Sequence, residues 1–97
     1  MVRRIIWTSK AVSVFSEILE LYYKRNGTKT YSRKLNSEIK QFINLLKRYP
    51  FLGKKTNTKD AMVLIKGNYK IFYKIEPDEI IIFMVWDCRQ DPNELGW

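Results

Sequence analysis

Hydrophobic positions along the chain follow two different periods. In the first half, apolar residues recur every three or four positions, which predicts two amphipathic helices. From Ala61 onward the period changes to one typical of strands, and a β-branched and aromatic segment, Val2–Trp7, predicts one further strand before the helices. The predicted order is therefore one strand, two helices and three strands.

The first predicted helix begins after Thr8 or Ser9, because either hydroxyl can accept a hydrogen bond from a free backbone N–H of the first turn. Gly27, which follows Asn26, is predicted to end it. The apolar stripe of this helix consists of Ala11, Phe15, Ile18 and Tyr22, broadened by Val14, Leu19 and Leu21.

The second predicted helix starts near residues 28–30 and ends at Tyr49, because Pro50 disfavours helical geometry in the residue before it. The short link between the helices predicts an antiparallel hairpin. The stripe of the second helix consists of Tyr31, Leu35, Ile39, Phe42, Leu46 and Tyr49.

The second half of the chain is predicted to contain most of the sheet. A loop is expected over Pro50–Asp60, with Gly67-Asn68 and Glu76–Asp78 as turns between strands. The strands are expected at Ala61–Lys66, Tyr69–Ile75 and Glu79–Trp86. The last of them is apolar on both faces and is therefore expected to be central.

These elements predict one α+β domain over residues 1–97, with the order β-α-α-β-β-β. Two amphipathic helices must bury their stripes, so the helical hairpin is expected to pack on one face of a mainly antiparallel four-stranded sheet. Strand alternation places one set of side chains toward the helices and the other set on the opposite, partly open face. The first set is Tyr69, Ile71, Tyr73 and Ile75, and the second is Lys70, Phe72 and Lys74.

Charge changes this picture, because it is unevenly distributed. The net charge is +8; residues 1–59 carry 14 Lys/Arg against 3 Asp/Glu, and residues 60–97 carry 4 against 7. Such a field attracts nucleic acid, ribosomes or an acidic protein, although a helical pair with solvated lysines would have the same composition.

The residue types present exclude several kinds of catalytic and metal-binding site. The chain has no histidine and a single cysteine, Cys88, which leaves no Cys–His nucleophile pair, ordinary zinc site or internal disulfide. Cys88 is expected to be a small packed residue. No nucleotide-binding glycine motif occurs, and no apolar run is long enough for a signal peptide or membrane span, so we expect a cytoplasmic protein without metal or cofactor.

A cationic and aromatic set remains as the candidate site. Lysines and an arginine could bind phosphate or neutralise charge in phosphoryl transfer, while aromatic rings could stack on bases. Taken singly, a lysine is more often a solvated surface residue than a phosphate ligand, and residues such as Tyr69, Tyr73 and Trp86 are more often core residues than binding residues. The set consists of Lys54, Lys55, Lys66, Lys70, Lys74 and Arg89, with Tyr69, Tyr73, Trp86 and Trp97.

Three segments in this order resemble the RelE/ParE superfamily of toxins from bacterial type II toxin–antitoxin systems. They are Tyr49-Pro-Phe-Leu-Gly-Lys54 after the second helix, Lys66-Gly-Asn-Tyr-Lys-Ile-Phe-Tyr73 across the hairpin, and Val85-Trp-Asp-Cys-Arg-Gln-Asp-Pro92 after the last strand. The family's usual forms are a Pro-x-x-Gly turn, a Gly-x-Tyr-Arg-Ile-x-Tyr strand and an arginine at the close of the last strand.

The resemblance implies a growth inhibitor that a cognate antitoxin neutralises. RelE-like members cleave mRNA on the ribosome, whereas ParE-like members inhibit DNA gyrase without being nucleases. In the nuclease branch, Lys70 and Arg89 would occupy the basic positions that contact phosphate, with Lys54, Lys55, Lys66 and Lys74 as further contacts to RNA or to the target.

Two departures bear on the choice between the branches. The stretch Ala61–Ile65 is apolar where the nuclease branch often has a basic pair, and no histidine or tyrosine follows Arg89. We therefore expect a ParE-like inhibitor that acts by binding, with gyrase as its target. A ribosome-dependent mRNA endoribonuclease and a non-toxic binding module are the alternatives, so enzymatic activity stays open.

The antitoxin is the expected partner. Its segment is expected to lie across the helical hairpin or along the sheet, with acidic charge complementary to the basic half. Asp87 and Asp91 are expected to form a turn or cap that holds the tail.

Overall fold

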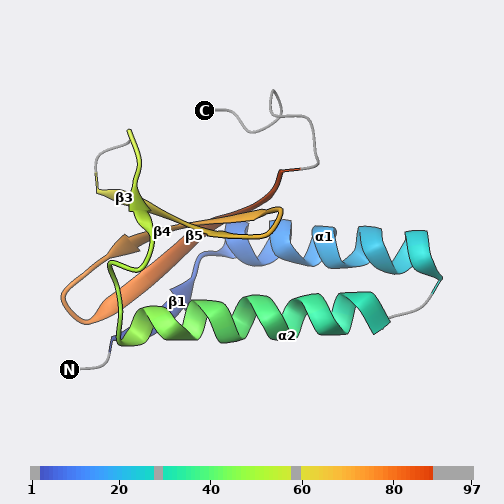
Figure 1. Cartoon of the computed structure of the whole chain (residues 1–97), viewed down its shortest axis with the longest axis horizontal. Helices are drawn as coiled ribbons and strands as arrows, with labels where there is room; N and C mark the ends of the chain where they lie inside the picture. The colour runs from blue at the N-terminus through green and yellow to red at the C-terminus, as the bar shows by residue number, and fades with distance from the viewer. Residues whose placement is uncertain (1–2, 28–29, 58–59, 89–97) are drawn as a thin grey trace.

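The computed structural model describes residues 3–27, 30–57 and 60–88 of the chain. Its elements follow the predicted order, with one additional strand (Figure 1). They are β1 (Arg4–Trp7), α1 (Ser9–Asn26), α2 (Thr30–Asn44), the 3-10 turn η1 (Leu45–Lys47), β2 (Lys54–Lys55), β3 (Ala61–Lys66), β4 (Tyr69–Ile75) and β5 (Glu79–Asp87).

Within these residues, five strands form one sheet in the order β1-β5-β4-β3-β2. β1 runs parallel to β5, with Ile5 opposite Ile80, and all the other pairs are antiparallel. β5 is an inner strand between β1 and β4, which explains its apolar residues on both faces, while β4 holds the middle place. The α+β class and the mainly antiparallel sheet are confirmed.

The two helices form an antiparallel hairpin that covers one face of the sheet (Figure 1). The core lies between these layers and takes residues from both helices and from β3, β4 and β5. Its fully buried side chains include Ile39, Leu46, Ile71, Tyr73, Ile80, Ile82 and Val85. Trp7 of β1 extends the core by stacking on Phe15 of α1, with ring centroids 5.6 Å apart.

Both predicted limits of the first helix are confirmed, and the structure decides between the two candidate caps. The Thr8 hydroxyl accepts a hydrogen bond from the Ala11 N–H at 3.1 Å, and Ser9 is the first helical residue. Gly27 takes a left-handed φ of 69° and donates its N–H to the Tyr23 carbonyl. Glycine adopts this conformation without steric cost, which explains the stop.

The end of the second helix differs from the prediction. α2 ends at Asn44, and the chain tightens into η1 before Pro50, so the helix does not reach Tyr49. The buried stripe of this helix also differs from the predicted one: Ile43 is buried on the core side, whereas Tyr31 and Tyr49, two members of the predicted stripe, are 39% and 59% exposed.

The strand count also differs, because part of the expected loop is the edge strand β2. Lys54 pairs with Val63 and Lys55 with Met62. A two-residue strand is too short for alternation to reveal it, so the predicted four-stranded sheet has five strands in the described part of the chain. No helix in these residues is long and apolar enough to cross a membrane.

Candidate functional site

The sheet face that points away from the helices, the outer face, collects three of the predicted cations. Lys70 lies opposite Ile65 and Trp86, and Lys74 lies opposite Ala61 and Ile81. Lys54 lies opposite Val63, whose own partner Phe72 stands between Lys70 and Lys74 in β4. Directly opposed residues share a face, so Lys54, Lys70 and Lys74 occupy this one surface.

The part of the outer face between these cations is apolar and aromatic. Phe72 is buried, and its ring lies 6.3 Å from that of Phe83. A bulge in the β4–β5 register places Phe83 between the partners of Phe72 and Tyr73. The Lys74 Nζ then lies 5.7 Å from the Phe83 ring centroid, a cation–π distance that holds an exposed lysine in place.

The other two described lysines of the predicted set lie elsewhere. Lys66 is opposite Tyr69 on the helix-covered side, and its Nζ lies 5.2 Å from the ring centroid of Phe42 in α2. Lys55 is opposite Met62, also on that side. The predicted set is thus divided between two surfaces, and Arg89, the remaining member, lies outside the described residues.

The aromatic members divide in the same way. Tyr69 and Tyr73 are buried toward the helices, as the core reading expected. Trp86 instead lies half-buried on the outer face, beside Lys70. Trp97 falls outside the described residues. The described outer face therefore offers an indole and three ammonium groups, but neither of these tyrosines.

Tyr73 joins two of the three segments that carry the resemblance. Its hydroxyl donates to the Pro50 carbonyl at 2.8 Å and accepts from the Gly53 N–H at 3.0 Å. A Cβ on Gly53 would lie 2.5 Å from the Val63 carbonyl oxygen and 2.7 Å from the Tyr73 hydroxyl oxygen, so only glycine fits there. Burial raises the pKa of Tyr73, and the Gly53 hydrogen bond partly opposes that rise.

A second buried polar group joins the helices to the end of β5. The Tyr22 hydroxyl of α1 donates to Asp87 Oδ2 at 2.6 Å, and Asp87 lies opposite Tyr69 in the β4–β5 register. Burial chiefly raises the pKa of Tyr69, with contributions from a hydrogen bond to Tyr31 and from the charge of Asp87. The rings of Tyr22 and Tyr31 lie 4.9 Å apart.

This cluster corrects two expectations. Asp87 is not a turn or cap residue but a buried strand residue, 2% exposed, bonded to a helix. Cys88, expected to be packed, is exposed, because β5 ends at Asp87. One sign in the sequence indicated a special role for Asp87, namely a charged residue at the end of an apolar strand. The sequence could not identify the partner, Tyr22, which lies 65 positions earlier in the chain.

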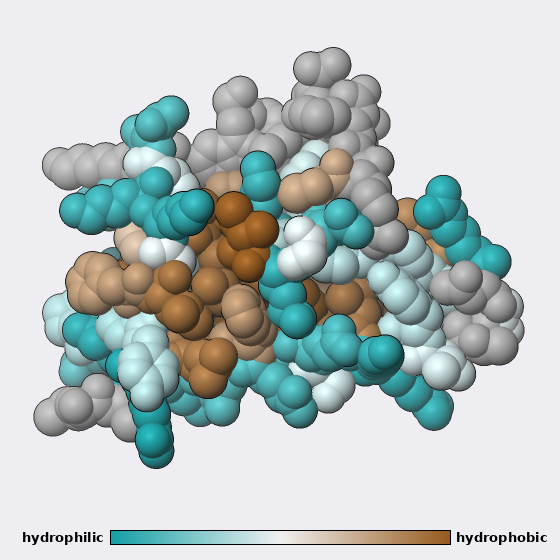
Figure 2. Space-filling model, in the orientation of Figure 1, coloured by the Kyte–Doolittle hydropathy of each residue, from teal (hydrophilic) through white to brown (hydrophobic). Residues whose placement is uncertain are grey.

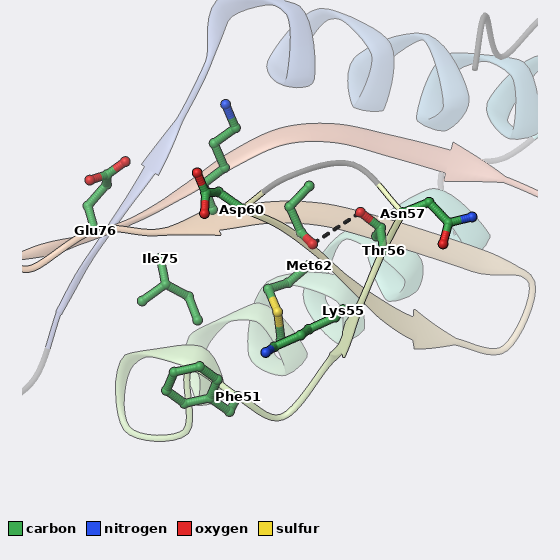
Figure 3. A pocket seen from close by; sticks show the side chains of 10 residues that line it. Phe51, Lys55, Thr56, Asn57, Asp60, Met62, Ile75 and Glu76 are labelled. Carbon is green, nitrogen blue, oxygen red and sulfur yellow. Dashed lines mark hydrogen bonds between the residues drawn. The ribbon is translucent and has the colours of Figure 1, made fainter.

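An open hollow of about 670 Å³ lies beside the β2–β3 connection (Figure 3). Phe51 stands on one side of it and Glu76 on another, with Lys55 and Asp60 also in the lining. The Thr56 hydroxyl donates to the Ala61 carbonyl at 3.1 Å and holds the connection together. Charges of both signs line the hollow, so it has no strong preference for an anion.

No group of three or more potential metal ligands comes together within residues 3–27, 30–57 and 60–88. The members of the predicted set that meet on the outer face are three lysine ammonium groups and the Trp86 indole. Ammonium groups bind anions through charge and hydrogen bonds.

Known structures share this arrangement of helices and sheet. A toxin–antitoxin structure described as the chromosomal ParDE system from P. aeruginosa superposes with a TM-score of 0.77 at 17% identity, covering 89% of this chain and 96% of that one. The RelBE2 complex from Mycobacterium tuberculosis gives a TM-score of 0.66 at 16% identity, covering 90% and 99%. The archaeal RelE–RelB complex from Pyrococcus horikoshii gives 0.57 at 16%, covering 94% and 100%.

Sequence comparison addresses the family directly. No curated protein matches the chain significantly. The model of the ParE toxin of the type II toxin–antitoxin system parDE, however, matches residues 5–92, nearly the whole chain and all three segments that carry the resemblance. The chain therefore belongs to the ParE toxin family of type II toxin–antitoxin systems.

Proposed function

We propose that this toxin inhibits growth by binding its target, with DNA gyrase as that target, and that a cognate antitoxin neutralises it. The observation that carries the proposal is the placement of Tyr69 and Tyr73. Both tyrosines of the hairpin strand are buried toward the helices, and burial raises the pKa of each.

RNA cleavage through the 2′-hydroxyl needs groups that remove and supply a proton near neutral pH. The chain has no histidine, and the acid at the edge of the outer face, Glu79, is paired with Arg4 at 3.3 Å. The three outer-face lysines can bind and neutralise phosphate. This chemistry supports binding over cleavage.

The test is a supercoiling assay with purified gyrase, run beside a translating extract in which mRNA integrity is followed. We expect the full chain to block supercoiling and leave translated mRNA intact. Unchanged supercoiling at saturating protein would rule out gyrase as the target.

A second candidate, a ribosome-dependent endoribonuclease, draws on one observation: Lys54, Lys70 and Lys74 share a face with Trp86. It predicts cleavage of ribosome-bound mRNA that Lys70→Ala and Arg89→Ala abolish. An extract in which the unmodified chain leaves mRNA uncut rejects this candidate.

A non-toxic binding module is the remaining alternative. Induced expression without the product of the neighbouring gene separates it from both toxins. Normal growth under those conditions would favour the module, and arrested growth that co-expression relieves would support the toxin and its antitoxin.

A further inference from the structure

The connection between α2 and β2 exposes large hydrophobic side chains in a short stretch. Leu45, Tyr49, Phe51 and Leu52 are 45%, 59%, 70% and 45% exposed. Together with the cations Lys47, Arg48 and Lys55 they form what we call the α2–β2 surface. Figure 2 shows hydrophobic surface gathered over this end of α2 and the strands beside it.

Folding of the turn does not account for this exposure. The Tyr73 hydroxyl holds Pro50 and Gly53, the first and last residues of the turn. The side chains of Phe51 and Leu52, which lie between them, take no part in these two hydrogen bonds. Phe51 is 70% exposed and Leu52 is 45% exposed. Their side chains are thus displayed at the tip of a turn whose backbone is held at both ends, which lowers the entropy lost on binding.

Two open hollows are lined in part by residues of the α2–β2 surface. The hollow of about 670 Å³ is lined by Phe51 and Lys55, and a second open hollow of about 480 Å³ is lined by Leu45 and Tyr49 (Figure 3 shows the first). A protruding ring beside two concave sites suits a partner that carries its own protruding apolar side chains.

Charge decides between the possible occupants. No Asp or Glu occurs between Ile39 and Lys59, so this stretch carries only positive formal charge. A second copy of the chain would bring the same positive field and would be repelled. An anionic membrane would meet Asp60 and Glu76 in the lining of the larger hollow, and it has no side chains to fill either hollow.

We infer that the α2–β2 surface binds an acidic amphipathic segment of the antitoxin, with Phe51 and Leu52 as its apolar anchors and Lys55, which lines the larger hollow together with Phe51, facing its carboxylates. The inference rests on the proposed function, since it names the surface on which the proposed partner docks.

The experiment uses the full chain and, as the probe, the product of the neighbouring gene, with affinity measured by titration calorimetry. The variant Phe51→Ala with Leu52→Ala should bind roughly tenfold or more weakly, as expected for central apolar anchors. Its matched control is Val12→Ala with Leu21→Ala, two α1 residues that are 48% and 40% exposed. Circular dichroism melting checks that both variants fold.

A charge-reversal pair tests the second half of the inference. Lys55→Glu should weaken binding and reduce its dependence on salt concentration, whereas Lys54→Glu, one residue earlier on the outer face, should leave that dependence nearly unchanged.

Each outcome has a distinct meaning. An anchor variant that binds as tightly as the unmodified chain overturns the inference while the antitoxin proposal stands, and absence of binding by the unmodified chain overturns both. Self-association in sedimentation, or binding to phosphatidylglycerol vesicles, that Phe51→Ala abolishes while antitoxin binding persists would assign the surface to a second copy or to a membrane instead.

Discussion

At the scale of single residues, Tyr73 is the side chain that connects distant parts of the sequence. Its ring lies in the core between helices and sheet, while its hydroxyl bonds to both ends of the Pro50–Gly53 turn. Strand alternation could place the ring in the core, and did so correctly. It could not identify the hydroxyl's partners, because hydrogen bonds across 20 and 23 positions leave no periodic signal.

Gly53→Ala should destabilise the fold by about 1–3 kcal/mol, the usual range for overpacking a filled site. The new Cβ would lie 2.5 Å from a backbone oxygen of β3, which cannot move without disturbing the β2–β3 pairing. Urea unfolding followed by circular dichroism measures the change. A variant as stable as the unmodified chain would show that the turn has room to relax.

Tyr73→Phe should also destabilise the fold, by about 1–3 kcal/mol, because it leaves the Pro50 carbonyl and the Gly53 N–H without their partner. Tyr49→Phe, which removes a hydroxyl from a 59% exposed ring, is the matched control and should change stability little.

The same tyrosine predicts how stability depends on pH. The pKa of Tyr73 is raised above its ordinary value of 10.0 in the folded chain, so its contribution is fully present below that value. As pH rises beyond it, the unfolded chain loses the proton first and stability falls. The free energy of unfolding in urea, measured at about pH 8 and about pH 11, should fall less between these two pH values in Tyr73→Phe than in Tyr49→Phe.

At the scale of elements, the helices and three long strands could be predicted because each presents a sustained period. The failures occur where an element is short or changes type. η1 and β2 contain three and two residues, too few for a period, and both lie in the connection that the Tyr73 hydroxyl organises. The sequence could not predict that Lys54 and Lys55 lie on opposite faces of the sheet, because their faces are set by β2, a strand too short to show a period.

The start of α1 offers a test of one element's boundary. Thr8→Ala removes the hydroxyl that accepts from the Ala11 N–H and should cost about 1 kcal/mol. Ser9→Ala, one residue later and inside the helix, should be nearly neutral or slightly stabilising, because alanine has the higher helix propensity. Equal losses in the two variants, measured by thermal or urea unfolding, would contradict the assignment of Thr8 as the cap.

At the scale of the whole molecule, two tyrosine contacts tie the layers together at opposite ends of β4. Tyr73 joins the sheet to the connection after α2, and the Tyr22–Asp87 bond joins α1 to the end of β5. The second contact brings a carboxylate into the interior of a chain with a net charge of +8. A buried carboxylate needs hydrogen-bond donors, so the position of the helical hairpin and that of the β5 end are set by the same contact.

Tyr22→Phe tests this coupling between the layers. Removing the donor at 2.6 Å takes one partner from the buried Asp87 and should cost about 2–3 kcal/mol, in the range for hydrogen bonds to charged groups. If the contact joins the layers, hydrogen exchange should accelerate in both α1 and the end of β5, since both lose the same restraint. Acceleration confined to α1, or a loss no larger than that of Tyr49→Phe, would show that β5 is held by its pairing with β4 alone.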